Sequence, residues 1–169
     1  MTTRTAHLTE RTEASAARVS TTVTVASGAD DAAAVEAVVR HHAELAASLA
    51  ARVEALSDAV GDLTSSGASP FETARERLVT FCTGELLPHA AAEEGTLYPA
   101  AAGDERARLL VEAMMAEHRV LENLVADVST TTRPIRAAAT ATALRVLFEV
   151  HLAKENDLIL PLVAADPTL

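Results

Sequence analysis

The sequence predicts an all-α fold, an up-down-up-down bundle of four helices preceded by a flexible N-terminal tail. Four segments carry apolar residues in steps of three and four, which is the spacing of one helix face. Short links that contain glycine or proline separate these segments. The chain of 169 residues is 49% hydrophobic, which suits one domain with a buried core. Helices of bundle length joined by short links favour this architecture.

The chain divides into two predicted regions. Residues 1–28 are rich in Thr, Ser, Ala and Arg with little apolar spacing, so we expect a disordered tail in which His7 is solvated. Residues 29–169 are expected to form the helical domain. Its first helix should end at Gly61, and residues 61–69 should form a flexible connection.

Proline residues mark the boundaries of the remaining helices. Pro70 stands at the first position of the second helix, where its missing N–H costs nothing. The third helix should follow Pro99 and Gly103, and the fourth should begin at Pro134. Pro88 lies inside the second segment, so it predicts either a bend or a break between two shorter helices.

One short pattern occurs twice, and it carries the chemistry of the chain. Both copies read His-x3-Glu-x3-(Leu/Ile)-x-Pro, over residues 89–99 and 151–161. A step of four residues turns a helix by about 400° and rises about 6 Å, so the His and Glu of each copy share one face. Each pair can therefore grip a metal ion from one side. The two pairs are His89 with Glu93 and His151 with Glu155.

Two more histidines, His42 and His118, lie within apolar stripes of other segments, and each has Leu three residues later. Burying a carboxylate is costly unless it is paired or binds a cation. Four histidines and two glutamates from four helices therefore predict a site for two transition-metal ions. Imidazole with carboxylate suits Fe, Mn, Zn, Co or Cu, and vacant positions would favour iron or manganese. One alternative is a His–Glu salt-bridge cluster, which does not explain the two copies. Another is a metal-free structural bundle, which would have to bury unpaired glutamates.

Five other side chains stand near the predicted ligands. His41 is rotated by about 100° from the histidine that follows it, so it should lie at the surface or orient a ligand. Glu122 repeats the His-x3-Glu spacing on the third helix, so it should stay outside the ligand set and is a candidate for orienting a ligand. We expect Tyr98 at the surface near a helix end, with a hydrogen bond to the site as the alternative. Glu94 and Glu117 should be solvated, with orientation of a ligand as the lesser alternative.

Composition excludes several classes of function. Fourteen basic against twenty-four acidic side chains give a net charge of −10, which argues against nucleic acid or an anionic membrane as partner. The sequence shows no apolar run of about 18 residues and no signal-peptide core, so we expect a cytoplasmic protein. The single Cys82 should be a small core residue. Apolar positions outside the stripes permit a weak homodimer, and a monomer is equally compatible.

The chain resembles the hemerythrin-like (HHE cation-binding) family over roughly residues 31–163. The segments that carry the resemblance are HHAEL around His42, HAAAEEGTLYP at 89–99, EHRVL around His118 and HLAKENDLILP at 151–161. The resemblance implies a four-helix bundle with a non-haem di-iron centre and a bridging oxo or hydroxo group. It also implies that Glu93 and Glu155 bridge the irons and that the four histidines complete the ligand set. Manganese and zinc are the less favoured metals.

The chain differs from the oxygen carriers of that family. Those carry a second histidine one turn along the third helix, where this chain has Glu122, and a longer spacing to the final carboxylate. The sequence is closer to the bacterial H…HxxxE…H…HxxxE type, for which the resemblance implies peroxide breakdown, a response to nitric oxide or oxygen, or iron handling. Reversible oxygen carriage is therefore not the expected function.

We expect a di-iron protein that binds and processes a small oxidant, with hydrogen peroxide or O2 first and nitric oxide next. A catalase-like or other di-iron oxidoreductase activity would follow, although the sequence leaves enzymatic activity open. One alternative is a binding module that senses O2, nitric oxide or iron, or that handles iron. Another is a di-iron oxygenase that acts on an organic substrate.

Overall fold

The computed structural model describes residues 29–61 and 69–164. The predicted disordered tail, with His7, lies outside the described residues, and so does most of the predicted connection after Gly61. Within the described residues the fold is all-α, as the sequence predicts.

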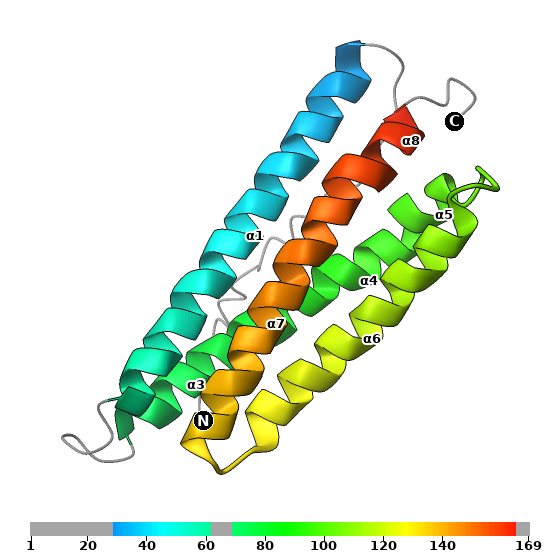
Figure 1. The fold of residues 1–169 in the computed structure, drawn as a ribbon. Coiled ribbons are helices and arrows are strands. Elements are labelled where there is room, and N and C mark those ends of the chain that lie inside the picture. Colours follow the sequence, from blue (N-terminus) through cyan, green and yellow to red (C-terminus); the bar gives the residue numbers. More distant parts are fainter. Residues whose placement is uncertain (1–28, 62–68, 165–169) are drawn as a thin grey trace, which may run out of the picture.

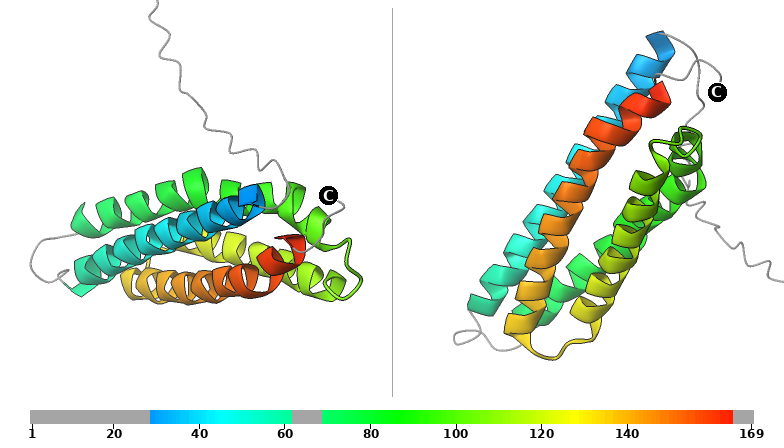
Figure 2. Two further views of the ribbon diagram at one scale, coloured as in Figure 1. Left: turned by 90° about the horizontal axis from the view of Figure 1, so that it is seen from above. Right: turned by 45° about the vertical axis from the view of Figure 1, so that its right-hand side comes forward.

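Four helical rods run alternately up and down, which confirms the predicted bundle (Figure 1). The first rod is α1 (Ala29–Gly61). The second consists of α3 (Ser69–Phe81), η1 (Cys82–Leu86) and α4 (Leu87–Gly95), and the short α5 (Leu97–Ala101) follows it. The third is α6 (Arg108–Thr130), and the fourth consists of α7 (Pro134–Lys154), η2 (Glu155–Ile159) and α8 (Leu160–Ala164). The rod of α7 packs against both α1 and α6, and α3 packs against α1 and α6 (Figure 2).

The elements η1 and η2 are π-helical turns, and a proline follows each of them after one residue. In both turns the N–H of the residue before the proline donates to a carbonyl five residues back instead of four. Proline lacks an N–H, and its ring clashes with the carbonyl four residues back, so the wider turn accommodates it. The predicted irregularity at Pro88 is therefore a π turn inside a continuous rod. The two bonds run from Leu87 to Cys82 and from Leu160 to Glu155.

Two apolar clusters fill the bundle. The larger contains Leu49, Leu78, Leu144 and Phe148, each at most 1% exposed. A smaller cluster lies toward the other end, and its members are Tyr98, Ala101, Val111, Met114 and Ile159. On α6 the predicted ligand His118 lies between Met114 of the smaller cluster and Leu121 of the larger one. Apolar packing therefore borders the predicted site on both sides.

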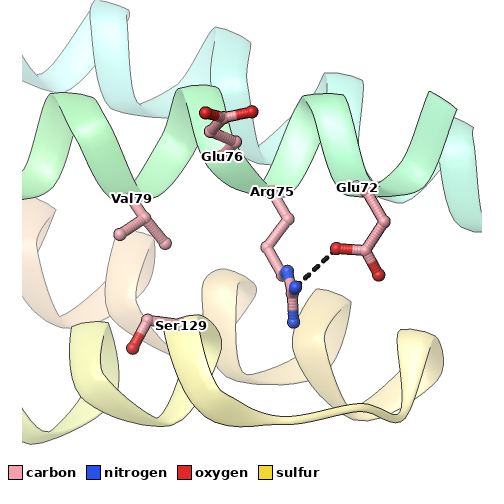
Figure 3. A pocket seen from close by; sticks show the side chains of 5 residues that line it. All are labelled: Glu72, Arg75, Glu76, Val79 and Ser129. Atoms are coloured by element: carbon pink, nitrogen blue, oxygen red, sulfur yellow. Dashed lines mark hydrogen bonds and ion pairs between the residues drawn. The ribbon is translucent and has the colours of Figure 1, made fainter. Parts of the chain in front are cut away.

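Arg75 ties α3 to the end of α6. Its Nη1 donates to the carbonyl of Thr131 at 2.7 Å, next to the last turn of α6, and its Nη2 lies 2.5 Å from Oε2 of Glu72. This contact satisfies a carbonyl that the helix end leaves without an internal partner. The side chain borders a hollow of about 290 Å³ between α3 and α6 (Figure 3). The hollow is lined by Glu72, Arg75, Glu76, Val79 and Ser129.

A wider groove of about 1220 Å³ runs between α1 and the start of the second rod, and its lining includes Ala55, Pro70 and Phe81. None of the six predicted ligands lines this groove or the smaller hollow. Within 29–61 and 69–164, no helix has the length and apolar character needed to cross a membrane.

Candidate metal centre

The structure brings the six predicted ligands together from all four rods. Five of them are buried, with exposed fractions of 0–6%, and the side chain of His89 is 14% exposed. Their nitrogen and oxygen atoms form two groups in which the donor atoms lie within 4.8 Å of one another. Both groups use the same two carboxylates. The groups are His42, His89, Glu93 and Glu155, and Glu93, His118, His151 and Glu155.

In the first group, the His42–His89 position, Glu93 lies between two imidazoles. Its Oε1 is 2.9 Å from Nε2 of His89 and 3.3 Å from Nε2 of His42. The second carboxylate is farther away, with Oε2 of Glu155 at 3.9 Å from Nε2 of His42. Two imidazole nitrogens and one oxygen from each carboxylate therefore face a common point.

In the second group, the His118–His151 position, the other oxygen of each carboxylate takes part. Oε1 of Glu155 is 3.3 Å from Nε2 of His151, and Oε2 of Glu93 is 3.7 Å from Nε2 of His118. The two Nε2 atoms are 2.9 Å apart. Each glutamate therefore offers one oxygen to each group, which is the arrangement a carboxylate needs to bridge two ions.

The donor atoms suit a cation because several of them are buried without a hydrogen-bond donor among the described residues. Within the described part of the chain, several buried atoms at this point have no hydrogen-bond partner: Nε2 of His42, Nε2 of His89, both oxygens of Glu93 and Oε2 of Glu155. Buried polar atoms are rarely left unpaired, since each costs about 1–3 kcal/mol. Imidazole nitrogens with carboxylate oxygens make a borderline-to-hard donor set for a divalent transition metal.

The outer ring nitrogens of three histidines are held by acceptors. Nδ1 of His42 is 2.7 Å from Oδ1 of Asn156. Because an amide oxygen only accepts, Nδ1 carries the proton and Nε2 presents its lone pair to the site. Asn156 is a residue that sequence reasoning missed, although its position directly after Glu155 was a usable signal.

Two glutamates hold the other two rings, and here the sequence-based expectation was wrong. Glu94 Oε1 lies 2.9 Å from Nδ1 of His118, and Glu117 Oε2 lies 3.0 Å from Nδ1 of His151. Both side chains were expected to be solvated, with orientation of a ligand as the lesser alternative. Each is long enough to reach a histidine on the neighbouring rod. Lys154 donates to the second oxygen of Glu117, which fixes that carboxylate.

Tyr98 is 1% exposed, so the expected surface position was wrong, and the alternative of a hydrogen bond to the site is the one observed. Thr96 leaves the helical conformation at φ −133° and ψ −69°, so α5 starts in a new direction and turns the phenol inward. The hydroxyl donates to Oε1 of Glu155 at 2.6 Å. It also lies 3.1 Å from Nε2 of His118 and 3.3 Å from Nε2 of His151.

The remaining two candidates lie farther out. His41 is exposed, and its ring stands edge-on to the ring of His89 at 5.1 Å between centroids. Glu122 is exposed and forms no hydrogen bond or ion pair with any described residue, so the structure does not place it behind a ligand. The inward stripe of α6 continues from His118 to Leu121 and Val125, which leaves Glu122 off the face.

Neighbouring charges in the cluster shift the pKa values of its carboxyl and imidazole groups. Burial alone would raise the pKa of Glu93, but the neighbouring imidazoles of His42 and His89 lower it to about 2. Burial alone would lower the pKa values of His42 and His151, yet the neighbouring Glu93 and Glu155 raise both. Cys82 is outside this cluster, and burial raises its pKa to about 12, which supports the predicted role as a core residue.

The comparisons with known proteins agree with this geometry. Residues 33–163 match the family described as the hemerythrin HHE cation binding domain. Comparison with curated proteins and with solved structures gives no match. The match spans most of the chain and includes all six buried or half-buried donors. The chain therefore belongs to the hemerythrin HHE cation-binding domain family.

Proposed function

We propose that this protein holds two iron ions between Glu93 and Glu155 and uses them to process a small oxidant, hydrogen peroxide or O2 first and nitric oxide next. The observation that carries the proposal is the pair of donor groups that share both carboxylates. When bound, an iron pair at this site would supply or accept two electrons. Disproportionation of two H2O2 into two H2O and O2 needs no external reductant, so peroxide is the first substrate to test.

The side chains around the site would have separate roles in holding the metal ions. Glu93 and Glu155 would keep the two ions close, because each offers one oxygen to each group. Glu94, Glu117 and Asn156 hold the imidazoles in the tautomer that points Nε2 inward. The apolar clusters on both sides limit access of bulk water. Iron is preferred to a softer ion because the donor set contains no thiolate.

Metal content and reaction with peroxide test this proposal together. Anaerobically purified protein should contain close to two irons per chain, with an iron-dependent absorption band that changes when peroxide is added. Glu93→Ala should lose two-metal loading and peroxide turnover. The matched control is Glu122→Ala, which removes a glutamate at the same spacing from a histidine but outside the cluster. Zinc in the native protein, or two irons and full activity in Glu93→Ala, would contradict the proposal.

A sensor is the second candidate function, because the donors come from all four rods. Occupancy of the site would therefore stabilise the whole bundle, and its loss could change a contact with a partner. Hydrogen exchange with and without metal tests this idea, and an unchanged pattern would exclude it. The oxygenase alternative has no support from the two hollows described above, since neither is lined by a donor residue.

Two further expectations remain predictions. One is the cytoplasmic location, and the other is the monomeric or weakly dimeric state. Three apolar residues outside the predicted stripes, Val39, Val79 and Val146, motivate the dimer. Val39 and Val146 are 38% and 49% exposed, as a weak dimer would allow, whereas Val79 packs against the core.

A further inference from the structure

We propose that the two metal positions are unequal and that the His118–His151 position binds its ion first and more tightly. This inference rests on the proposed function, because it requires a site for two ions. The carboxylates are shared, so the difference must come from the histidines and their surroundings. The side chains around the two positions differ in charge, in hydrogen bonding and in exposure.

Charge behind the imidazoles is the first difference. At the His118–His151 position, both Nδ1 atoms donate to carboxylates, at 2.9 Å from Glu94 and 3.0 Å from Glu117. An anionic acceptor increases the electron density of the ring and makes the inner Nε2 a better metal ligand. Both histidines of this position are therefore hydrogen-bonded to a carboxylate.

At the His42–His89 position, no carboxylate accepts a hydrogen bond from the outer ring nitrogens within the described residues. Nδ1 of His42 meets the amide oxygen of Asn156, and the ring of His89 contacts the rings of His41 and His42 edge-on at 5.1 Å. Among the described residues, Nδ1 of His89 has no hydrogen-bond partner. An amide fixes the orientation of a ring, but it polarises the ring less than a carboxylate does.

Corresponding positions in the sequence carry different residues, and this difference produces the contrast between the two metal positions. Glu94 directly follows Glu93 and holds the histidine of α6, whereas Asn156 directly follows Glu155 and holds the histidine of α1. Glu117 and His41 directly precede the histidines of α6 and α1. In both comparisons the anionic residue serves the His118–His151 position.

Tyr98 adds a fixed polar group on the same side. Its hydroxyl donates to Oε1 of Glu155, the oxygen that faces His151, and lies close to the inner nitrogens of both imidazoles. The equivalent place in the second copy of the pattern is Leu160, which offers no polar atom. The donors of the His118–His151 position are therefore held in place before metal arrives, and preorganisation favours tight binding.

Exposure points in the same direction. The side chains of His118 and His151 are 3% and 1% exposed. At the other position His42 is 1% exposed, and the difference comes from His89, which is 14% exposed. A half-buried ligand exchanges more easily with water. The His42–His89 position is therefore the one expected to fill second and empty first.

Titration of the metal-free full chain with Mn²⁺ tests the order of filling by calorimetry and by the electron paramagnetic resonance of the bound ion. We expect two steps that differ at least about tenfold in Kd. The first equivalent should give the signal of a single isolated ion. His151→Ala should remove the tight step, and His42→Ala should keep it.

Reciprocal exchange of the supporting residues keeps the test independent of the ligands themselves. Glu94→Asn and Glu117→Gln should each weaken the first step by about 10–100-fold, since outer hydrogen-bond partners carry effects of that size. Asn156→Glu should leave the first step unchanged and strengthen the second. Two equal steps in the natural chain, or a first step weakened by Asn156→Ala and not by Glu117→Gln, would overturn the inference. Failure to bind any metal would instead contradict the proposed function.

Discussion

The two copies of the His-x3-Glu pattern have the same key residues and different structures. After Glu93 the helix α4 ends at Gly95, the backbone turns at Thr96, and α5 brings Tyr98 into the site. After Glu155 the rod continues without interruption through η2 into α8. A repeated motif therefore places its His and Glu alike, while the residues that follow decide what stands beside them.

The difference leaves the two copies unequally satisfied. In the first copy, Nε2 of His89 and both oxygens of Glu93 have no hydrogen-bond partner within the described chain. In the second copy, Oε2 of Glu155 is the one such atom, because Tyr98 contacts both His151 and Oε1 of Glu155. Metal binding should thus matter more for the order of the first copy than for that of the second.

Removal of the metal is the strongest way to test this comparison. Each ion at a thousand times its Kd adds about 4 kcal/mol to the free energy of unfolding. Chelation should therefore lower the unfolding midpoint markedly, and amide hydrogen exchange should rise more in α4 than in α7 and η2. Glu93→Ala protein treated with the same chelator is the control, because its loss of two-metal loading is already expected. Greater loosening of η2 than of α4 would contradict the comparison.

The hydroxyl of Tyr98 is the polar group that the second copy lacks. Tyr98→Phe keeps the ring stacked on His118, at 5.3 Å between centroids, and removes the donor to Glu155. Leaving a buried acceptor unpaired should cost about 1–3 kcal/mol in the free energy of unfolding of the metal-free protein, measured by urea titration. Glu122→Ala should change the same quantity by less than about 0.5 kcal/mol. Equal stabilities of Tyr98→Phe and the natural chain would show that this hydrogen bond is replaceable.

Acid and alkali should act on different copies of the metal-free protein. The pKa of Glu93 is lowered to about 2, so its stabilising contribution is present above about pH 4.5 and is lost as the pH falls toward 2. The pKa of His151 is raised, so its contribution is present below about pH 6.5 and is lost as the pH rises through the higher folded value. His42, on α1, follows the direction of His151.

The metal-free protein should therefore be most stable between about pH 4.5 and 6.5. With metal bound, protons compete with the ion for the imidazoles, so stability should instead increase with pH across the same range. Unfolding midpoints measured from pH 4 to 8, with and without metal, check both directions. A metal-free protein that becomes more stable from pH 6.5 to 8 would be inconsistent with the raised histidine pKa values.

The sequence was sufficient for the features that depend on periodicity. Helical spacing placed His42 and His118 on the inward stripes, and the His-x3-Glu spacing placed both pairs on one face. Periodicity could not predict features that depend on a local change in the direction of the backbone or on contact between rods. The turn at Thr96 that buries Tyr98 and the reach of Glu117 across to His151 belong to this second kind.

The smallest expected change in the free energy of unfolding concerns Gly95, where α4 ends; at the corresponding place in the second copy the rod continues. Gly95 is exposed at the end of α4, it lies outside the left-handed region, and a Cβ there would meet nothing within 4 Å. Gly95→Ala should therefore stabilise the protein by about 0.5–1 kcal/mol, because alanine loses less backbone entropy on folding. Urea unfolding measures this gain, and metal content should stay unchanged. A loss of metal would show that the turn at Thr96 needs the freedom of glycine, whereas the expected result would assign that turn to the residues from Thr96 to Pro99.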